Sequence, residues 1–301
     1  MYRRLKGLYK VEQDKLEGSK LHIVDVNSVG RARWFHFKDF CWEVDGEIVG
    51  TGAIYGILSL FKKIPLHEPV VFCFDSKNNL RKKEYDGYKK SRSSAGLDNY
   101  FKQMEILKSI LVNSRFSTLW RDGYEADDFI DYVTFKYRDK YDNIFIYSGD
   151  YDLAHLVDRN IYLINSVSKR NDISINNYES VLGIPYNTIF LYKATVGDNS
   201  DEIKGIKGFG KKSFNKFIND ISKIYYTPDI RYKNLEKQII LDYDGFSEEQ
   251  REQALQSLNV ILPKRPAEFL VDDIEYFKVD ETLFKWYLER FGMKSILKVL
   301  R

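Results

Sequence analysis

Residues 144–152 read IFIYSGDYD, which is an apolar run followed by a turn and two carboxylates. Similar apolar runs occupy residues 21–25, 70–75 and 161–164, and the first two of these also end in an aspartate. Short runs that are rich in β-branched residues and lack polar alternation are typical of strands buried on both faces of a parallel sheet. The four segments therefore predict the strands of such a sheet.

Helical patterns lie between the predicted strands. In residues 100–111 apolar side chains recur at three- and four-residue spacing, and residues 126–137 show the same spacing. Alternating strands and helices predict an α/β domain, in which a mostly parallel sheet is flanked by helices. We expect this domain to cover residues 21–190, after an N-terminal extension of residues 1–20.

Beyond about residue 191 only helical patterns remain. Phe214, Phe217 and Ile218 stand at helical spacing, and residues 247–250 have the pattern of a capping box that opens a helix to about residue 258. The last helices are expected at residues 282–288 and 295–300. We therefore expect residues 191–301 to form a helical region.

The composition excludes several classes of protein. The chain has 301 residues, of which 44% are hydrophobic, so it can bury a sizeable core. It contains no apolar stretch near the roughly 18 residues of a membrane span, and its charged first twenty residues contain no secretory signal. We therefore expect a cytoplasmic protein without a membrane partner.

Cysteine and histidine offer little for metal binding. Only Cys41 and Cys73 occur, and the four histidines are scattered without the spacing of metal ligands. A disulfide framework and a cysteine-based zinc site are therefore excluded. Any metal ion must be held by oxygen.

Nine carboxylates stand where an α/β fold would bring them together. Some follow predicted strands, whose carboxyl ends line the ligand-binding edge of such a sheet, and others open a predicted helix. Each alone has an ordinary explanation, as a turn former or as a partner of the helix dipole. The nine are Asp25, Asp75, Glu125, Asp127, Asp128, Asp150, Asp152, Asp198 and Asp201.

As a group, the nine carboxylates could not stay ionised side by side without cations. Hard divalent ions suit such oxygen ligands, with Mg²⁺ first and Mn²⁺ as the alternative, and the number of carboxylates suggests a pair of ions that clamp a phosphoryl group. The rest of the chain is basic, because removing these nine negative charges from the net charge of +3 leaves +12. An acidic cluster in a basic chain suits a protein that binds and cleaves a polyanion.

The acidic segments match a known pattern in their order and spacing. They are residues 23–25, 73–75, 124–128, 148–152 and 197–201. With them the chain resembles the 5′-nucleases of the flap endonuclease superfamily, especially the stand-alone bacteriophage 5′-3′ exonucleases and the 5′-nuclease domain of DNA polymerase I. The resemblance covers about residues 21–218. It implies a PIN/5′-nuclease-like sheet with a helical arch, and a C-terminal duplex-binding region that contains a helix–three-turn–helix at about residues 197–218.

The resemblance also divides the carboxylates between two metal ions. On the side of the first ion it places Asp25, Asp75, Glu125, Asp127 and Asp128. On the side of the second it places Asp150, Asp152, Asp198 and Asp201. The chain departs from the family pattern after the first aspartate, where residues 26–28 read VNS instead of Gly-x-Asn. This departure affects local contacts and removes no carboxylate.

A basic segment with interleaved tyrosines, residues 76–99, follows Asp75. Such a segment suits single-stranded nucleic acid, because its charges follow the phosphates and its rings stack on bases; a solvated loop is the alternative. By resemblance the segment is the arch, in which Lys89 stabilises charge on the scissile phosphate and Arg81 assists. The DNA contacts expected from it are Lys82, Lys83, Tyr88, Lys90 and Arg92.

A glycine-rich segment, residues 205–213, precedes the predicted helix around Phe214. Glycines permit close backbone approach, and amides at a helix start can bind phosphate, although a simple turn is the alternative. By resemblance this segment grips the duplex backbone without reading base sequence, and binds K⁺. Its expected DNA contacts are Gly205, Gly208, Gly210, Lys211 and Lys212.

The resemblance implies a structure-specific 5′-nuclease, a 5′-3′ exonuclease and flap endonuclease of replication and repair. Its expected substrates are branched, nicked or 5′-flap DNA and the RNA primers of RNA–DNA hybrids. We expect a monomer that works beside replication proteins, in the host cytoplasm if a phage encodes it. Two alternatives stay open: an endoribonuclease of single-stranded RNA, which the duplex clamp and arch oppose, and a non-catalytic branched-DNA-binding protein, which the complete acidic set opposes.

Overall fold

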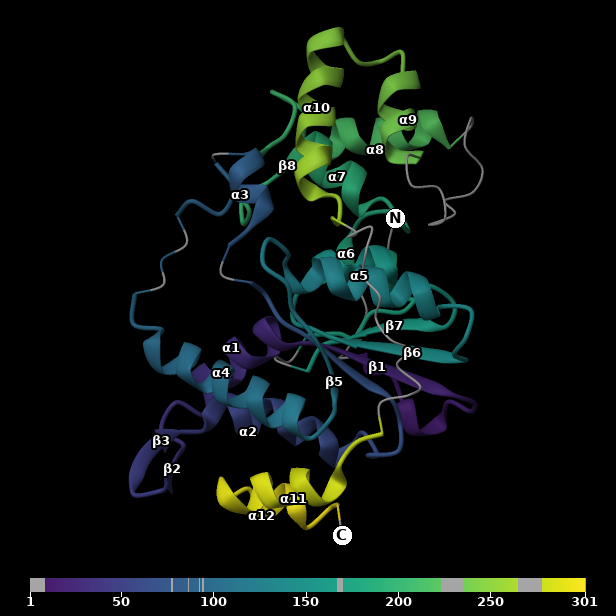
Figure 1. The fold of residues 1–301 in the computed structure, drawn as a ribbon. Coiled ribbons are helices and arrows are strands. Elements are labelled where there is room, and N and C mark those ends of the chain that lie inside the picture. Colours follow the sequence, from purple (N-terminus) through teal and green to yellow (C-terminus); the bar gives the residue numbers. More distant parts are fainter. Residues whose placement is uncertain are drawn as a thin grey trace.

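The computed structural model describes residues 9–76, 78–85, 87–91, 93, 95–166, 170–222, 235–264 and 278–300. Its centre is a five-stranded sheet in the order β5-β4-β1-β6-β7 (Figure 1). All neighbouring strands in it are parallel. The strands are β1 (Lys20–Asp25), β4 (Val70–Cys73), β5 (Ser117–Leu119), β6 (Asn143–Tyr147) and β7 (Ile161–Ile164).

The four predicted strands are confirmed, and β5 is an addition that the sequence did not suggest. β5 has only three residues, two of them hydroxylic, so it lacks the long apolar run that identifies the others. Side chains along β1 alternate between two separate cores. Leu21 and Ile23 face one core, and Val24 faces the other. The absence of polar alternation in the sequence therefore has a simple cause, since both faces of the sheet are covered.

Helices cover both faces of the sheet (Figure 1). On one face lie α1 (Val26–His36), α2 (Gly52–Leu58) and α4 (Asp98–Asn113), and on the other lies α5 (Ala126–Tyr137). The helices predicted at residues 100–111 and 126–137 are thus confirmed. α5 begins with a capping box, in which the Glu125 and Asp128 side chains exchange bonds with each other's backbone amides.

The helices that follow residue 177 pack on both faces of the sheet. The segments α6 (Tyr178–Leu182), α7 (Ile189–Val196), α8 (Lys211–Ile221), α9 (Leu235–Asp242) and α10 (Glu248–Ile261) contribute to the core on the α5 side. In contrast, α11 (Glu281–Arg290) and α12 (Lys294–Leu297) lie on the opposite face (Figure 1). There the Phe284 ring makes T-shaped contacts with Phe61 and Phe116 at centroid distances of 5.2 and 4.9 Å. The predicted capping box at Ser247 and the predicted closing helices are present.

Short elements complete the described chain. A hairpin of β2 (Cys41–Val44) and β3 (Glu47–Gly50) follows α1, and a two-stranded ribbon of β8 (Gly197–Asp198) and β9 (Ile203–Lys204) follows α7. The described part of the predicted arch contains one short helix, α3 (Leu80–Glu84), before α4 begins. Three 3-10 segments are η1 (Gln13–Lys15), η2 (Ser59–Lys62) and η3 (Tyr151–Leu156). Among the described residues, no helix has the length and apolarity needed to cross a membrane.

Candidate metal centre and arch

Asp25, the last residue of β1, lies at the centre of the acidic edge. It is 7% exposed, and its carboxylate accepts hydrogen bonds from the Ser28 backbone at 3.0 Å and from the Ser148 hydroxyl at 2.7 Å. Burial raises the pKa of Asp25 to about 7, and the charges of Asp75 and Asp150 add to the rise. Asp25 is therefore a carboxyl group whose ionised form needs a nearby cation.

The residues after Asp25 connect neighbouring strand ends. The Asn27 side chain accepts a hydrogen bond from the Asp75 backbone at 3.0 Å, and the Ser28 hydroxyl accepts one from the Gly149 backbone at 2.9 Å. The departure from the family pattern at residues 26–28 thus keeps the carboxylate-bearing segments together.

Asp75 follows β4 and meets the start of α5. Its Oδ1 accepts a hydrogen bond from the Ala126 backbone at 2.8 Å. Desolvation by the surrounding protein raises the pKa of Asp75, and the negative charge of Glu125 contributes to the rise. The parallel strand ends and the helix start therefore crowd Asp25, Asp75 and Glu125 at one edge, as predicted.

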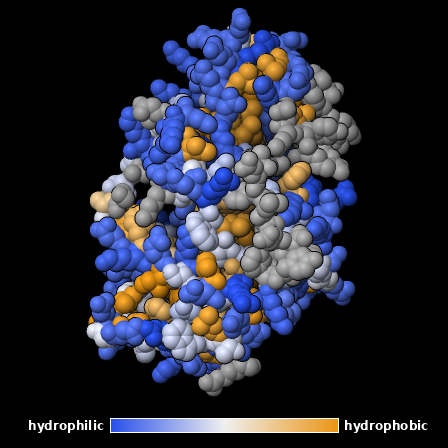
Figure 2. Space-filling view, viewed as in Figure 1, coloured by the Kyte–Doolittle hydropathy of each residue, from blue (hydrophilic) through white to orange (hydrophobic). Residues whose placement is uncertain are grey.

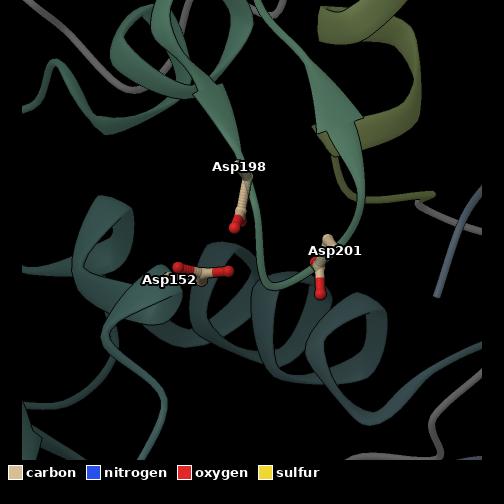
Figure 3. Close-up of side chains that lie close together, drawn as sticks. All are labelled: Asp152, Asp198 and Asp201. Carbon is tan, nitrogen blue, oxygen red and sulfur yellow. The ribbon is translucent and has the colours of Figure 1, made fainter. Parts of the chain in front are cut away.

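A second group of carboxylates, here called the acidic trio, consists of Asp152, Asp198 and Asp201. Each offers an oxygen within 4.8 Å of the others, and no other three potential ligands among the described residues come this close. Figure 3 shows Asp198 at the end of β8 and Asp201 on the turn that leads to β9, with Asp198 pointing toward Asp152. Burial and the charge of Asp150 raise the pKa of Asp152 to about 6.

Lys193, which the sequence reasoning missed, pairs with the acidic trio. Its ammonium donates to Asp152 and to Asp198. Although burial disfavours its charge, these two carboxylates raise the pKa of Lys193. A usable signal was present in the sequence, since Lys193 is the one charged residue of the otherwise apolar helix α7 and precedes Asp198 by five positions.

Glu125, Asp127 and Asp128 lie at the start of α5 and are paired with Arg81 of α3, whereas Asp150 caps η3. The guanidinium, 1% exposed, binds Glu125 at 2.8 Å and Asp128 at 2.6 Å, and lies 3.7 Å from Asp127. Asp128 is fully buried, whereas Asp127 keeps a buried oxygen, Oδ1, that accepts no hydrogen bond from the described residues. Arg81 could reach a phosphate only by leaving these partners, so its catalytic role stays a prediction.

The other predicted catalytic residue, Lys89, also contacts Glu125. Its ammonium binds Glu125 Oε1 at 2.7 Å, while the Tyr88 hydroxyl donates to Oε2 of the same side chain at 2.9 Å. Burial opposes ionisation of Glu125, but Lys89 and Arg81 outweigh it and lower the pKa of this carboxyl. The Lys89 backbone also donates to the Asp201 carbonyl at 3.3 Å. Lys89 therefore lies between Glu125 at the start of α5 and Asp201 of the acidic trio, which belong to the two halves of the acidic cluster.

The predicted DNA contacts are mostly exposed. Lys82, Lys83 and Lys90 are exposed on the arch, as are Lys211 and Lys212 on α8, whereas Tyr88 is buried and Arg92 lies outside the described residues. Gly205 is required by close approach, because a Cβ there would lie 2.2 Å from the Val196 carbonyl carbon. Gly208 has a φ of +77° and Gly210 lies in open space. The helix–three-turn–helix assignment stays a prediction.

A cleft of about 1550 Å³ lies over the acidic edge of the sheet and is lined by Asp25, Asp75, Asp127, Asp150, Asp152 and Asp201. Its lining includes carboxylates from both halves of the cluster and the cations Lys82, Lys89 and Lys193. Hydrophilic side chains dominate the molecular face drawn in Figure 2, with apolar residues in smaller patches. The cleft thus has the mixed charge expected of a site for a phosphate chain and its counter-ions.

The residues fit a site for divalent cations. Their donors are carboxylate oxygens, which hard ions prefer, and one of them, Asp127 Oδ1, is buried without a hydrogen-bond donor among the described residues. The Lys193 ammonium already places one positive charge against the acidic trio. The residues that would hold ions are Asp25, Asp75, Asp127 and Asp150 together with the acidic trio.

A parallel sheet with carboxylates gathered at its carboxyl edge is the arrangement expected of a metal-dependent phosphodiesterase. The comparisons specify the family. Residues 20–182 match the family described as 5′-3′ exonuclease, N-terminal resolvase-like domain. The chain therefore belongs to the 5′-3′ exonuclease family.

The chain is 34% identical to a 5′-3′ exonuclease of Aquifex aeolicus, over 82% of this chain and 84% of the relative. It is 31% identical to DNA polymerase I of Caldicellulosiruptor bescii over 72% of this chain, but spans only 26% of that much longer protein. Among solved structures, the fold is similar to a bacteriophage T5 flap endonuclease in complex with DNA and metal ions, with a TM-score of 0.59, 21% identity, and coverage of 91% of this chain and 99% of that one.

Proposed function

We propose that this protein is a structure-specific 5′-nuclease, which hydrolyses DNA phosphodiesters near a free 5′ end with the help of two Mg²⁺ ions. The observation that carries the proposal is that Asp25, Asp75, Asp150, Asp152 and Asp201 line one cleft, with Asp198 beside the last two. The named activity of the relatives, 5′-3′ exonuclease, supports it. Mn²⁺ is the alternative ion.

The acidic groups would hold the ions through carboxylate oxygens. When bound, the ions supply the Lewis acidity that polarises a phosphate and activates water. Asp25, whose pKa burial raises to about 7, would be one of the groups that hold an ion in their ionised form. Asp150 fixes the backbone of Asp152, since its Oδ1 accepts a hydrogen bond from the Asp152 amide at 2.8 Å.

The basic residues would orient the DNA. Lys89 lies on the cleft beside Glu125, where its ammonium can stabilise charge on the scissile phosphate. The exposed lysines Lys211 and Lys212 at the start of α8 suit contacts with the duplex backbone, because the amides of a helix start also favour phosphate. The Gly205–Gly210 loop that precedes α8 is the proposed place for K⁺.

The proposed substrates are those of a protein that contacts phosphates and not bases. Contacts to phosphates carry no base sequence, so we propose that branched, nicked and 5′-flap DNA are recognised by shape, and that primers in RNA–DNA hybrids are also removed. Replication and repair are the corresponding setting.

The deciding experiment maps the products of a 5′-labelled flap DNA, first with Mg²⁺ and then with EDTA. We expect short 5′ products with Mg²⁺ and none with EDTA. Preferential cutting of single-stranded RNA would favour the endoribonuclease, and tight flap binding without cutting under either condition would favour the branched-DNA-binding protein. Substitution of Mn²⁺ for Mg²⁺ in the same assay tests the choice of ion.

A further inference from the structure

Arg81 links the arch to a distant part of the chain. Its Nε donates to the Val260 carbonyl at 3.0 Å, and its Nη2 lies 3.4 Å from the Leu262 carbonyl. These two carbonyls belong to the last turn of α10 and the residue after it. Together with the carboxylates of Glu125 and Asp128, they surround a guanidinium that is 1% exposed.

Asp128 completes the link from the other side. Its Oδ1 accepts hydrogen bonds from Arg81 Nη2 and from the Lys264 backbone, both at 2.6 Å. Its Oδ2 accepts hydrogen bonds from the Glu125 backbone and from Arg81 Nη1, both at 3.0 Å. Asp128 is fully buried, and each oxygen has two protein donors, so a buried charge is compensated by a fixed set of partners.

Apolar contacts surround the same junction. Tyr88, Ile203 and Val260 form a small buried cluster, against which Tyr85 and Ile261 pack. The arch, the β8–β9 ribbon and the end of α10 each contribute one of the three buried side chains. The base of the arch is therefore held by both polar and apolar contacts to α10.

We propose that residues 260–264, here called the arch anchor, are a positioning element of the nuclease. By fixing Arg81 and Asp128, the anchor sets the base of the arch, and eight residues further on the arch places Lys89 against Glu125 in the cleft. Arg81 is then a positioning residue that acts through the arch, and does not touch the phosphate. The inference rests on the proposed function for its kinetic effect, but the anchor itself can be tested without DNA.

The sharpest test is the pair Lys264→Pro and Lys264→Ala. Proline removes the backbone N–H that donates to Asp128, whereas alanine keeps it and removes the exposed side-chain contacts of the ammonium with Glu84 and with the Asn259 carbonyl. We expect hydrogen–deuterium exchange in residues 81–85, where the Tyr85 amide is bonded to the Arg81 carbonyl, to become about tenfold faster in Lys264→Pro. Exchange in β1 and β6 stays unchanged, and Lys264→Ala exchanges like the parent protein.

The kinetic arm uses flap DNA and Mg²⁺. Lys264→Pro should lower kcat about threefold to tenfold with little change in KM, because Lys89 is less often in place while the duplex contacts remain. Arg81→Lys, which keeps the charge but not the fork of contacts, should accelerate the same exchange and lower kcat in the same way. This second variant decides the matter if proline disturbs the fold.

The outcomes are distinguishable. Normal exchange in residues 81–85 of both Lys264→Pro and Arg81→Lys would overturn the anchor. An unchanged kcat in Lys264→Pro, with a large loss in Arg81→Ala alone, would place Arg81 on the phosphate instead and overturn the positioning role. If the parent protein cuts no flap DNA, the proposed function fails, and the exchange measurements still decide whether the anchor exists.

Discussion

The two halves of the acidic cluster balance their charge differently. At the start of α5, Glu125 and Asp128 share a buried guanidinium that also binds backbone carbonyls of the arch anchor. On the other side of the cleft, Asp152 of η3 and Asp198 of β8 are partly exposed and share the ammonium of Lys193. Arginine presents a rigid fork that fixes several partners at once, whereas lysine is a compact charge on a flexible stem. The first half is thus built into the fold, and the second is more open to exchange with a metal ion.

The largest effect is expected where ions would be held. The double variant Asp150→Asn/Asp152→Asn should lower cleavage of flap DNA by a factor of about 10³ or more, because amides replace two carboxylates at the phosphate. DNA binding, followed by fluorescence anisotropy in EDTA, should remain, since the lysines are untouched. Normal turnover by this variant would remove the metal centre from Asp150 and the trio.

Removal of the Arg81 guanidinium, which pairs with the carboxylates at the start of α5, should lower the stability of the fold. We expect Arg81→Ala to lower the free energy of unfolding by about 3–5 kcal/mol, because buried carboxylates are left without their partner. Lys193→Ala at the more open half should cost much less. Urea denaturation of both variants makes the comparison, and equal losses would contradict the difference drawn between the two halves.

The pH dependence of stability should reflect the raised carboxyl groups. The pKa of Asp25 is raised to about 7 and that of Asp152 to about 6, both by burial first. A raised pKa in the folded state means that stability is full below the ordinary pKa near 4 and is lost as pH rises through about 6 to 7. Mg²⁺ binds the ionised groups, so its stabilising effect should grow over the same range.

The measurement is the increase in Tm on addition of Mg²⁺, at about pH 5.5 and about pH 8. A larger increase at the higher pH is expected. The buried His22, whose pKa is lowered by burial, affects the protein equally with and without Mg²⁺ and cancels in the difference. An increase that is independent of pH would contradict the role of Asp25 and Asp152.

The smallest effect concerns Lys193 itself. Lys193→Ala should tighten Mn²⁺ binding several-fold, because the ion no longer shares Asp152 and Asp198 with an ammonium. Electron paramagnetic resonance of free Mn²⁺ measures the affinity directly. The matched control is Lys216→Ala, an exposed lysine of α8, which should leave the affinity as it was. Weaker Mn²⁺ binding in Lys193→Ala would show that the lysine supports the ion and does not compete with it.

Much of the fold could be predicted from the sequence because burial leaves a local pattern. The apolar runs of β1, β4, β6 and β7 and the spacing in α4 and α5 are visible residue by residue. β5 could not be found, because a three-residue edge strand is defined by its pairing with β4 and not by its own side chains. The β2–β3 hairpin was missed for a similar reason, since its residues are largely exposed.

The sequence places the carboxylates at one edge of the sheet, but it does not reveal the partners of the cations or the presence of Lys193. Strand ends reveal Asp25 and Asp150 because parallel strands share an edge. The partners of Lys193 and Arg81 are set by contacts between segments far apart in the chain, such as Arg81 with Val260, and no spacing within one segment records them. The resemblance implies the importance of Lys89, but its bond to Glu125 is visible only in the folded structure.

The placement of α11 and α12 has a practical consequence for shortened versions of this chain. These helices bury Phe284, Leu288 and Ile296 on the face of the sheet opposite α5, far from the residues that precede them in the described chain (Figure 1). A truncation before Glu281 would leave the aromatic rings of Phe61 and Phe116 without the Phe284 ring. Such a fragment would retain every carboxylate of the cleft but would expose an apolar surface. Its first defect would therefore be aggregation, and not the loss of residues that the cleft needs.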